Sequence, residues 1–339
     1  MNRLSIFPCV VADIGGTNAR FGIATGGKDK DNRFTVEQQK VYSCAEFTKF
    51  EILFQKYLDT ARIENQHKPK PKYACIAIAA PITGDLVSMT NLDWTFSVND
   101  LCQQNNMEKI HVVNDFGALA YSTLYLQGSE LKTIYSGNSK ASASETQSRA
   151  IIGPGTGLGI AGLINTDSGW HPVCGEGGHI SFAPTDSFQF KVREAILSTL
   201  KTEHISIENV LSGPGIVNLH QAICQVYGKN EDVLTAAQIS ANAANRSNEN
   251  CVKALDLFTQ ILGASAGDMA LTMGAFGGVY LSGGILPKII EAMDIELLIE
   301  HYLNKGVKQD LLKTIPIHLI SAPMPALTGA AHLMFDLRG

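Results

Sequence analysis

The first residues whose types suggest chemistry lie in the segment VVADIGGTNARFG, at positions 10–22. A short apolar run meets Asp13 and then Gly15, Gly16 and Thr17, after which apolar spacing resumes. One interpretation is a β-hairpin, in which glycine supplies a positive φ and Asp and Asn are ordinary turn residues. The other is a loop whose bare backbone N–H groups face an anion such as a phosphate. This segment taken alone leaves both interpretations open.

Two further glycine turns strengthen the phosphate interpretation. The segment AIIGPGTGLGIAGLI at 150–164 repeats the pattern of two apolar runs around a Gly-Thr turn, which here is Gly155, Thr156 and Gly157. Gly283 and Gly284 end a third apolar run and precede Pro287. By itself that pair indicates a tight turn before a helix that has Pro near its first position. Three such turns in this order favour a nucleotide site in a duplicated fold, with the third turn lying against adenine or ribose.

Two common nucleotide loops do not fit this sequence. The stretch from Gly22 to Lys28 approaches a Walker loop, but Asp29 stands where the magnesium-binding Ser or Thr is needed, so we expect the segment GGKDKDN at 26–32 to be a solvated turn. The segment after 155–157 alternates like a strand instead of opening a helix, which argues against a dinucleotide-binding Rossmann site. Phosphate binding would therefore depend on backbone N–H groups and on the hydroxyls of Thr17 and Thr156. Asp13 would lie near a magnesium ion and hold it through water, because that ion keeps much of its hydration shell.

Asp115 is the strongest candidate for a proton acceptor. It follows the apolar run KIHVV at 109–113, at the carboxyl end of a predicted strand, where α/β proteins place their ligands. The alternative is a helix N-cap for the segment FGALAYSTLYL, because Asp is favoured at that position. On the residues alone the two interpretations are even.

The elements that must position these residues alternate between strands and helices. Short apolar runs at Tyr73–Ala80 and Lys109–Val113 have strand length, and apolar spacing of three and four residues predicts helices over Ala45–Arg62 and Asn250–Met273. The run from Leu4 to Ala12 is interrupted by Pro8 and lacks a small-residue cleavage site, so we expect a buried first strand and no signal peptide. This alternation predicts an α/β protein with parallel or mixed sheets.

Composition excludes several classes of function. The 339 residues carry a net charge of −5, so the chain lacks the excess of positive charge that binds nucleic acid or an anionic membrane. The seven cysteines are scattered and form no C-x-x-C pair, which suits a reducing, cytoplasmic setting and argues against a thiolate zinc site. The uncharged stretch Met269–Leu286 has the length of a membrane span, but its glycine pairs are more typical of a strand and its turns. We therefore expect small-molecule chemistry with no nucleic-acid or membrane partner.

Taken together, the motifs resemble those of the bacterial glucokinase family, within the superfamily of sugar kinases, actin and heat-shock chaperones. The resemblance extends from about residue 10 to 333. Its motifs are ADIGGTNAR (12–20), AAPITGD (79–85), TNLDW (90–94), VNDFGA (113–118), GPGTGLG (153–159), GEGGHISFAP (175–184), LSGPG (211–215), FGGVYLSGGI (276–285) and TGAAHL (328–333). Two positions depart from the common pattern of the family, Ala12 where Gly is usual and Pro154 where Ala is frequent. Neither departure removes a polar group.

The resemblance implies a fold and an activity. The fold would be a two-lobed, duplicated, ribonuclease-H-like or actin-like ATPase fold with a central cleft. Residues 1–118 plus 322–339 would form a small α/β lobe, and residues 119–321 a large one. The activity would be transfer of phosphate from ATP to the 6-hydroxyl of D-glucose, the first step of glycolysis, with Mg²⁺ as cofactor. Whether the chain acts alone or as a homodimer stays open.

The resemblance also assigns roles to residues. Asp115 would be the general base, and Asn114, Glu176, His179 and Glu208 would hydrogen-bond the other sugar hydroxyls. The ATP- and phosphate-binding residues would be Ala12, Asp13, Ile14, Gly15, Gly16, Thr17, Gly155, Thr156, Gly157, Gly283 and Gly284, and Asp13 would also serve the magnesium ion through water.

Some of these roles have rivals. Glu176 and His179 have the spacing of a metal pair, although the glycines around them disfavour a helix, and they also fit an exposed turn. Glu208 could be a charged residue in a first helical turn. Two other functions also stay open, namely a kinase for another hexose or an N-acetylated amino sugar, and a sugar-binding regulator without turnover.

Overall fold

The chain divides into two compact units, each built on its own sheet. The computed structural model describes residues 3–64, 69–89, 92–138, 146–229 and 232–337. The first unit contains Met1–Leu131, Thr166–Cys174 and Ala322–Gly339, and the second contains Lys132–Asn165 and Gly175–Ser321. As in the expected division, the chain returns to the first unit at residue 322. Residues 119–131 and 166–174, which the resemblance assigns to the large lobe, belong to the first unit here. Thr90 and Asn91 of the TNLDW motif lie outside the described residues.

The first unit has a mixed sheet in the order β3-β2-β1-β4-β7. The five strands of this sheet are β1 (Cys9–Ile14), β2 (Asn18–Lys28), β3 (Phe34–Ser43), β4 (Tyr73–Ile78) and β7 (Lys109–Asn114). The unit also contains strands β5 (Leu86–Ser88), β6 (Thr95–Ser97) and β11 (Gly169–Cys174), which lie outside this sheet. Its α-helices are α1 (Phe50–Glu64), α2 (Val98–Gln104), α3 (Asp115–Ser122) and α11 (Pro325–Asp336). Strands β1 and β2 form an antiparallel hairpin, whereas β1, β4 and β7 run parallel.

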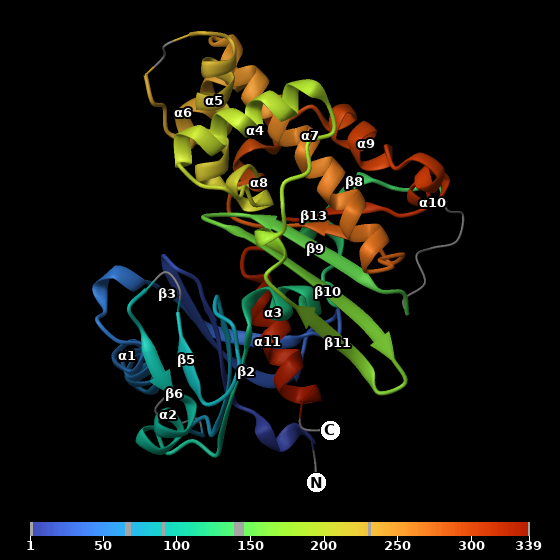
Figure 1. The fold of residues 1–339 in the computed structure, drawn as a ribbon. Coiled ribbons are helices and arrows are strands. Elements are labelled where there is room, and N and C mark those ends of the chain that lie inside the picture. Colours follow the sequence, from blue (N-terminus) through green and yellow to red (C-terminus); the bar gives the residue numbers. More distant parts are fainter. Residues whose placement is uncertain (1–2, 65–68, 90–91, 139–145, 230–231, 338–339) are drawn as a thin grey trace. The chain divides into compact units, whose positions relative to one another are not determined.

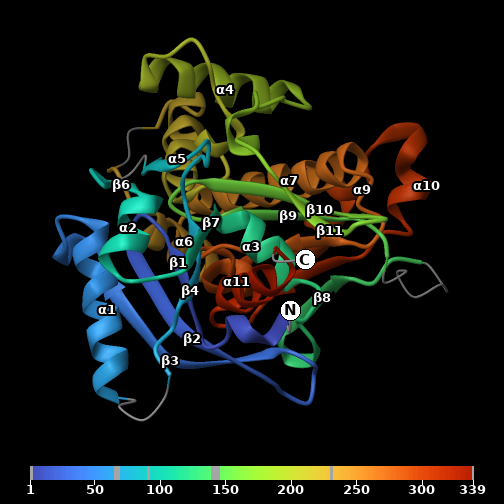
Figure 2. The ribbon, with the colours of Figure 1, turned by 90° about the horizontal axis from the view of Figure 1, so that it is seen from below.

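The two faces of this sheet are covered by different helices. Val10, Ala12 and Ile14 alternate along β1 and belong to one apolar cluster with Phe50 and Phe54 of α1. Helix α11 packs on β1 and β4 and also lies against α3, as Figures 1 and 2 both show. The C-terminal helix therefore supports the helix that begins at Asp115.

The second unit repeats the strand plan of the first. Its strands run in the order β10-β9-β12-β13-β8, with β9 and β10 antiparallel and β9, β12 and β13 parallel. The same plan of a hairpin followed by two parallel strands orders β2-β1-β4-β7 in the first unit. The strands are β8 (Leu131–Tyr135), β9 (Arg149–Pro154), β10 (Leu158–Thr166), β12 (Val279–Leu281) and β13 (Ile317–Ile320). The expected α/β class and its internal duplication are thereby confirmed.

Helices supply most of the core of the second unit. They are α4 (Ser187–Leu200), α5 (Gly213–Val226), α6 (Ala236–Ala244), α7 (Glu249–Thr272), α8 (Leu286–Ile289), α9 (Ile295–Leu303) and α10 (Gln309–Leu312). Figure 1 shows α4, α5, α6, α7 and α9 gathered on one side of β9 and β10. Helix α7 packs against α5, α6 and α9, and its buried residues join those of β9 and β12 in one cluster.

The structure bears out several sequence-based expectations and corrects others. The helix predicted over Asn250–Met273 is α7. The solvated turn expected over 26–32 begins later, because β2 continues to Lys28 and the turn covers residues 29–32. The first strand is shorter than predicted, because it begins at Cys9 and not at Leu4. Pro8 has no N–H to donate to a sheet, so the strand begins after it.

The predicted helix over Ala45–Arg62 is also shorter at its start, since α1 begins at Phe50. No helix in the described ranges is both long and apolar enough to cross a membrane.

A buried histidine in the first unit makes the stability of this fold depend on pH. His332 on α11 is buried, and its Nε2 accepts a hydrogen bond from the backbone N–H of Phe34 at 3.3 Å. Its ring stacks on Tyr125 with 3.4 Å between centroids. Burial, assisted by the positive charge of Lys28, lowers the pKa of His332 to about 3, and Asp29 opposes this shift. The imidazole is therefore neutral in the folded chain.

We expect the folded state to lose stability as the pH falls below 6.5. The unfolded chain binds a proton at His332 near pH 6.5, whereas the folded chain does not bind it until about pH 3. Each pH unit in this window costs about 1.4 kcal/mol, hence about 2 kcal/mol between pH 6.5 and 5. Urea unfolding at pH 5, 6 and 7 measures this slope in the wild type and in His332→Phe. The same slope in both proteins would show that His332 does not cause it.

Candidate active site

The predicted site residues of the first unit follow one edge of its sheet. In the register of the parallel strands, Ile14 at the end of β1 pairs with Ile78 of β4, and Ile78 pairs with Asn114 of β7. All three strands therefore end in one row, and the segments that follow them begin side by side. Two strand spacings of about 4.8 Å separate the end of β1 from the end of β7. The fold thus places Gly15–Thr17 and Asp115 at the same carboxyl edge, where α/β sheets bind ligands.

The segment from Gly15 to Thr17 is the turn of a hairpin. The N–H of Gly15 donates to the carbonyl of Asn18 at 3.0 Å, and the carbonyl of Thr17 accepts from Cys44. The N–H groups of Gly16 and Thr17 have no hydrogen-bond partner within the described ranges. The hairpin interpretation is confirmed as a shape, and that shape leaves two adjacent N–H groups and the exposed Thr17 side chain for a ligand.

Asp13 forms an ion pair that sequence reasoning missed. Its Oδ2 lies 3.0 Å from Nη1 of Arg20, directly across the hairpin. Burial raises the pKa of Asp13, and the guanidinium of Arg20 opposes this shift. The hairpin register was the available signal, because a turn over 15–18 pairs residue 14 with residue 19 and residue 13 with residue 20. Arg20 thus brings a positive charge to a loop that has no lysine.

Helix α3 begins at Asp115, but its N-cap is the preceding residue. The side chain of Asn114 accepts from the N–H of Gly117 at 3.2 Å, which satisfies one of the free donors of the first turn. The interpretation of Asp115 as the N-cap is therefore wrong. Oδ1 of Asp115 accepts from the N–H of Phe116 at 2.9 Å, and the residue is half-buried. With its oxygen engaged in the cap, Asn114 still has its amide NH₂ group to offer a ligand.

Strand β11 lies against the first turn of α3. A Cβ on Gly117 would lie 2.6 Å from the Sγ of Cys174 and 3.5 Å from Pro172, so a side chain at 117 would require Cys174 to move. Burial raises the pKa of the Cys174 thiol to about 11, and the negative charge of Asp115 contributes. The thiol is therefore protonated at neutral pH and does not compete with Asp115 as a base. No pattern in the sequence indicated that β11 lies beside α3.

The second unit has an equivalent loop at the end of β9. Gly155 donates to the carbonyl of Gly157 at 2.7 Å, and the N–H of Gly213, in the first turn of α5, donates to the carbonyl of Gly155 at 2.9 Å. Gly283 adopts a φ of +93°, and a Cβ there would overlap the carbonyl of Pro154. The fold thus brings 155–157 and 283–284 together, as a nucleotide site would require.

The GEGGH segment forms one 3₁₀ turn, η4 (Gly177–His179), with Glu176 as its N-cap. A Cβ on Gly178 would overlap the carbonyl of Leu158, and one on Gly177 would lie 2.9 Å from Ile160, so both glycines let this turn approach β10. Glu176 and His179 are exposed. In the part of the chain that the structure describes, no three His, Cys, Asp or Glu side chains gather as metal ligands, so nothing there supports the metal-pair alternative.

Glu208 lies on a second 3₁₀ turn, η5 (Ile207–Asn209), which packs against η4. Its Oε2 accepts from the N–H of Leu158 at 2.8 Å, immediately after the loop at 155–157. As the alternative interpretation expected, Glu208 lies in the first turn of a helix, but that helix is the 3₁₀ turn η5 and not α5, which begins at Gly213. Within the second unit, therefore, Glu176, His179, Glu208 and the two glycine turns are neighbours.

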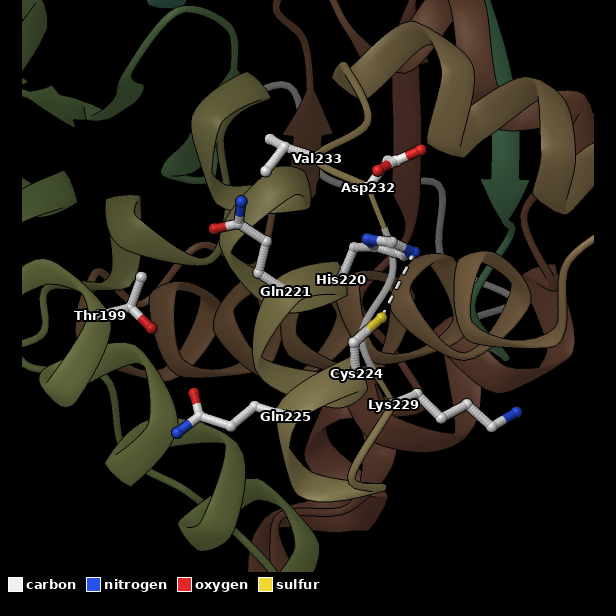
Figure 3. Close-up of a pocket in the computed structure, with 8 residues that line it drawn as sticks. All are labelled: Thr199, His220, Gln221, Cys224, Gln225, Lys229, Asp232 and Val233. Atoms are coloured by element: carbon white, nitrogen blue, oxygen red, sulfur yellow. Dashed lines mark hydrogen bonds between the residues drawn. The ribbon is translucent and has the colours of Figure 1, made fainter.

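A pocket elsewhere in the second unit contains none of these residues. It has a volume of 380 Å³ and lies beside α4 and α5. Figure 3 shows the residues that line it, including His220 and Cys224, whose Nε2 and Sγ are 3.7 Å apart. The pocket is thus separate from the predicted site.

Two α/β units with the same strand plan, each with a glycine hairpin at the carboxyl edge of its sheet, define the class of sugar kinases and actin-like ATPases. The glucokinase family model matches residues 10–336. The chain is 40% identical over 326 residues to a glucokinase of Saccharophagus degradans, covering 96% of this chain and 98% of that protein. The chain belongs to the glucokinase family.

Solved structures agree with this assignment. A glucokinase from an Antarctic psychrotroph superposes with a TM-score of 0.85 at 36% identity, covering 97% of this chain and 98% of that one. A ROK-family glucokinase from Streptomyces griseus, solved with glucose and AMPPNP, superposes with a TM-score of 0.60 at 17% identity over 96% of this chain and 98% of that one, and so shares the fold.

Proposed function

We propose that this chain transfers the γ-phosphoryl group of ATP to the 6-hydroxyl of D-glucose, with Asp115 as the general base. ATP-dependent glucose phosphorylation follows from membership of the family. The finer assignment rests on the position of Asp115 at the carboxyl edge of β7, where the residue is half-buried at the start of α3. As the bond between the sugar oxygen and the γ-phosphorus forms, the bond from that phosphorus to the bridging oxygen of ADP breaks, the hydroxyl proton passes to the carboxylate, and ADP leaves.

The main support for the proposal is that glycine occurs at two positions, Gly15 and Gly155, where the backbone and the packing would also accept a side chain. Gly15 and Gly155 both have φ outside the left-handed region, and a Cβ would meet only atoms at 3.6 Å and 3.8 Å, which is ordinary contact. Alanine would therefore fit at both turns in the free protein. Bare backbone at the same place in both units supports close approach of a ligand, and free N–H groups at such a turn favour a phosphate.

Sugar recognition is proposed for Asn114, Glu176, His179 and Glu208. The amide of Asn114 donates, the carboxylates accept, and the imidazole can do either, so the set matches a ring of hydroxyls. Exposure of Glu176 and His179 supports this assignment, because their polar atoms are available to a ligand.

Magnesium is proposed to arrive with ATP. The ion is commonly bound by substrate phosphates, waters and one or two carboxylates. Asp13 fits that role, because Oδ2 pairs with Arg20 and Oδ1 remains for a water of the ion. When bound, the ion would neutralise charge on the transferred group.

The test is a coupled assay for glucose 6-phosphate with purified protein, ATP and Mg²⁺. We expect turnover with glucose and none after chelation with EDTA, restored by added Mg²⁺. ADP release, measured by a coupled assay that does not depend on the sugar, detects the alternative substrates mannose, fructose and N-acetylglucosamine. Turnover of another sugar with glucose untouched would contradict the assignment of glucose.

A further inference from the structure

The turn that carries Glu208 packs against the GEGGH segment at 175–179, and the Glu208 side chain contacts the glycine loop at 155–157. Its Oε2 lies 2.8 Å from the N–H of Leu158, the first residue after the loop. A Cβ on Gly157 would lie 2.5 Å from the same oxygen and 3.3 Å from Cδ. The carboxylate therefore covers the backbone of the loop, and glycine at 157 is what allows this contact.

The backbone around Glu208 is tied to the same loop. Ser212 Oγ donates to the carbonyl of Glu208 at 2.7 Å. The next residue, Gly213, donates its N–H to the carbonyl of Gly155 at 2.9 Å. The turn that carries Glu208 and the loop at 155–157 thus share two independent connections, one through the side chain and one through the main chain.

The turn that carries Glu208 is also hydrogen-bonded to the chain directly after the GEGGH segment, in which Glu176 and His179 lie. The N–H of Ile207 donates to the carbonyl of Ile180 at 2.8 Å, directly after η4. Oε2 is the only oxygen of Glu208 that the loop engages within the described ranges, and Oε1 would lie 3.8 Å from the Cβ position of Gly157. Within the described ranges Oε1 accepts no hydrogen bond, so this second oxygen can accept one from a ligand.

We propose that Glu208 couples glucose binding to the conformation of the nucleotide loop. The inference rests on the proposed function, in which Glu208 accepts a hydrogen bond from glucose. Glucose bound at one carboxylate oxygen fixes the other against Leu158 and Gly157, so the loop is ordered before the nucleotide binds. Glucose and nucleotide then strengthen each other's binding by the same factor, since coupling between two sites is reciprocal.

Two alanine substitutions in the same loop separate this coupling from a general effect on the loop. Gly157→Ala places a methyl group against the Glu208 carboxylate, whereas Gly155→Ala meets only an ordinary contact. Glucose affinity is measured by calorimetry without nucleotide, and folding is checked by thermal unfolding. We expect Gly157→Ala to weaken glucose binding at least tenfold and Gly155→Ala to change it less than twofold, although both lie in the nucleotide loop.

A second measurement follows nucleotide binding and uses Glu208→Gln, a variant in which the side chain keeps its size. AMPPNP binding with Mg²⁺ is measured with and without saturating glucose. In the wild type we expect glucose to tighten it at least fivefold, within the usual range of coupling. In Glu208→Gln, which retains an acceptor for Leu158 but offers an amide to the sugar, the ratio should fall below twofold. The control Glu203→Gln, at an exposed residue of the same unit, should retain the wild-type ratio.

The outcomes distinguish this inference from the proposed function. Equal glucose affinities in Gly157→Ala and Gly155→Ala, or an unchanged AMPPNP ratio in Glu208→Gln, would overturn the coupling while leaving glucose phosphorylation intact. A wild type that is folded and binds no glucose would overturn the proposed function and the coupling together.

Discussion

Replacement of Asp115 by asparagine is expected to lower kcat for glucose phosphorylation by a factor of about 10² to 10⁴, the range that a positioned general base contributes. The variant keeps the size of the side chain and an oxygen that can accept from the Phe116 N–H at its present 2.9 Å. It removes only the capacity to take the hydroxyl proton. Glucose affinity should stay within a few-fold of the wild type, so the loss belongs to the chemical step.

The matched control is Asp100→Asn. Asp100 also lies in the first turn of a helix of the first unit, α2, and is exposed. The same change of charge at a helix start should leave kcat unchanged there. Coupled assays measure kcat and calorimetry measures glucose affinity for both variants, which separates a loss in the chemical step from a loss in binding. If Asp115→Asn retained more than about a tenth of wild-type kcat, another group would be the base.

Substitution of Gly329 by alanine is expected to have the largest effect on stability. Gly329 lies on α11, where a Cβ would overlap the carbonyl of Ala118 on α3 and lie 3.1 Å from the N–H of Ser122. Backbone of a neighbouring helix cannot yield as a flexible side chain can, so the two helices must separate. We expect a cost of about 3 kcal/mol, at the upper end of ordinary overpacking, which corresponds to a fall in Tm of about 6–12 °C.

The same substitution should also reduce activity, because α3 begins with Asp115. Movement of α3 away from α11 displaces that carboxylate, so kcat should fall in the fraction that remains folded. Gly84→Ala is the control, since no atom lies within 4 Å of its Cβ position. Thermal unfolding and kcat are measured for both variants. Equal melting temperatures in the two would show that the contact between α3 and α11 adapts at little cost.

The sequence by itself determined the class of fold and the chemistry of the candidate site. Apolar runs, amphipathic spacing and paired glycine turns are local patterns, and they predicted α/β units with one glycine hairpin in each. Asp115 was recognised because a short apolar run ends just before it. The family resemblance then assigned roles to Glu176, His179 and Glu208, which spacing alone could not distinguish from ordinary turn residues.

Only the tertiary structure decided which of these residues are neighbours and which glycines are structural. Strand register fixed the ion pair of Asp13 with Arg20, and side-chain direction made Asn114 the cap of α3 in place of Asp115. The contact of Glu208 with Leu158 joins residues fifty positions apart. Such contacts depend on how elements pack in three dimensions, which local sequence patterns do not encode.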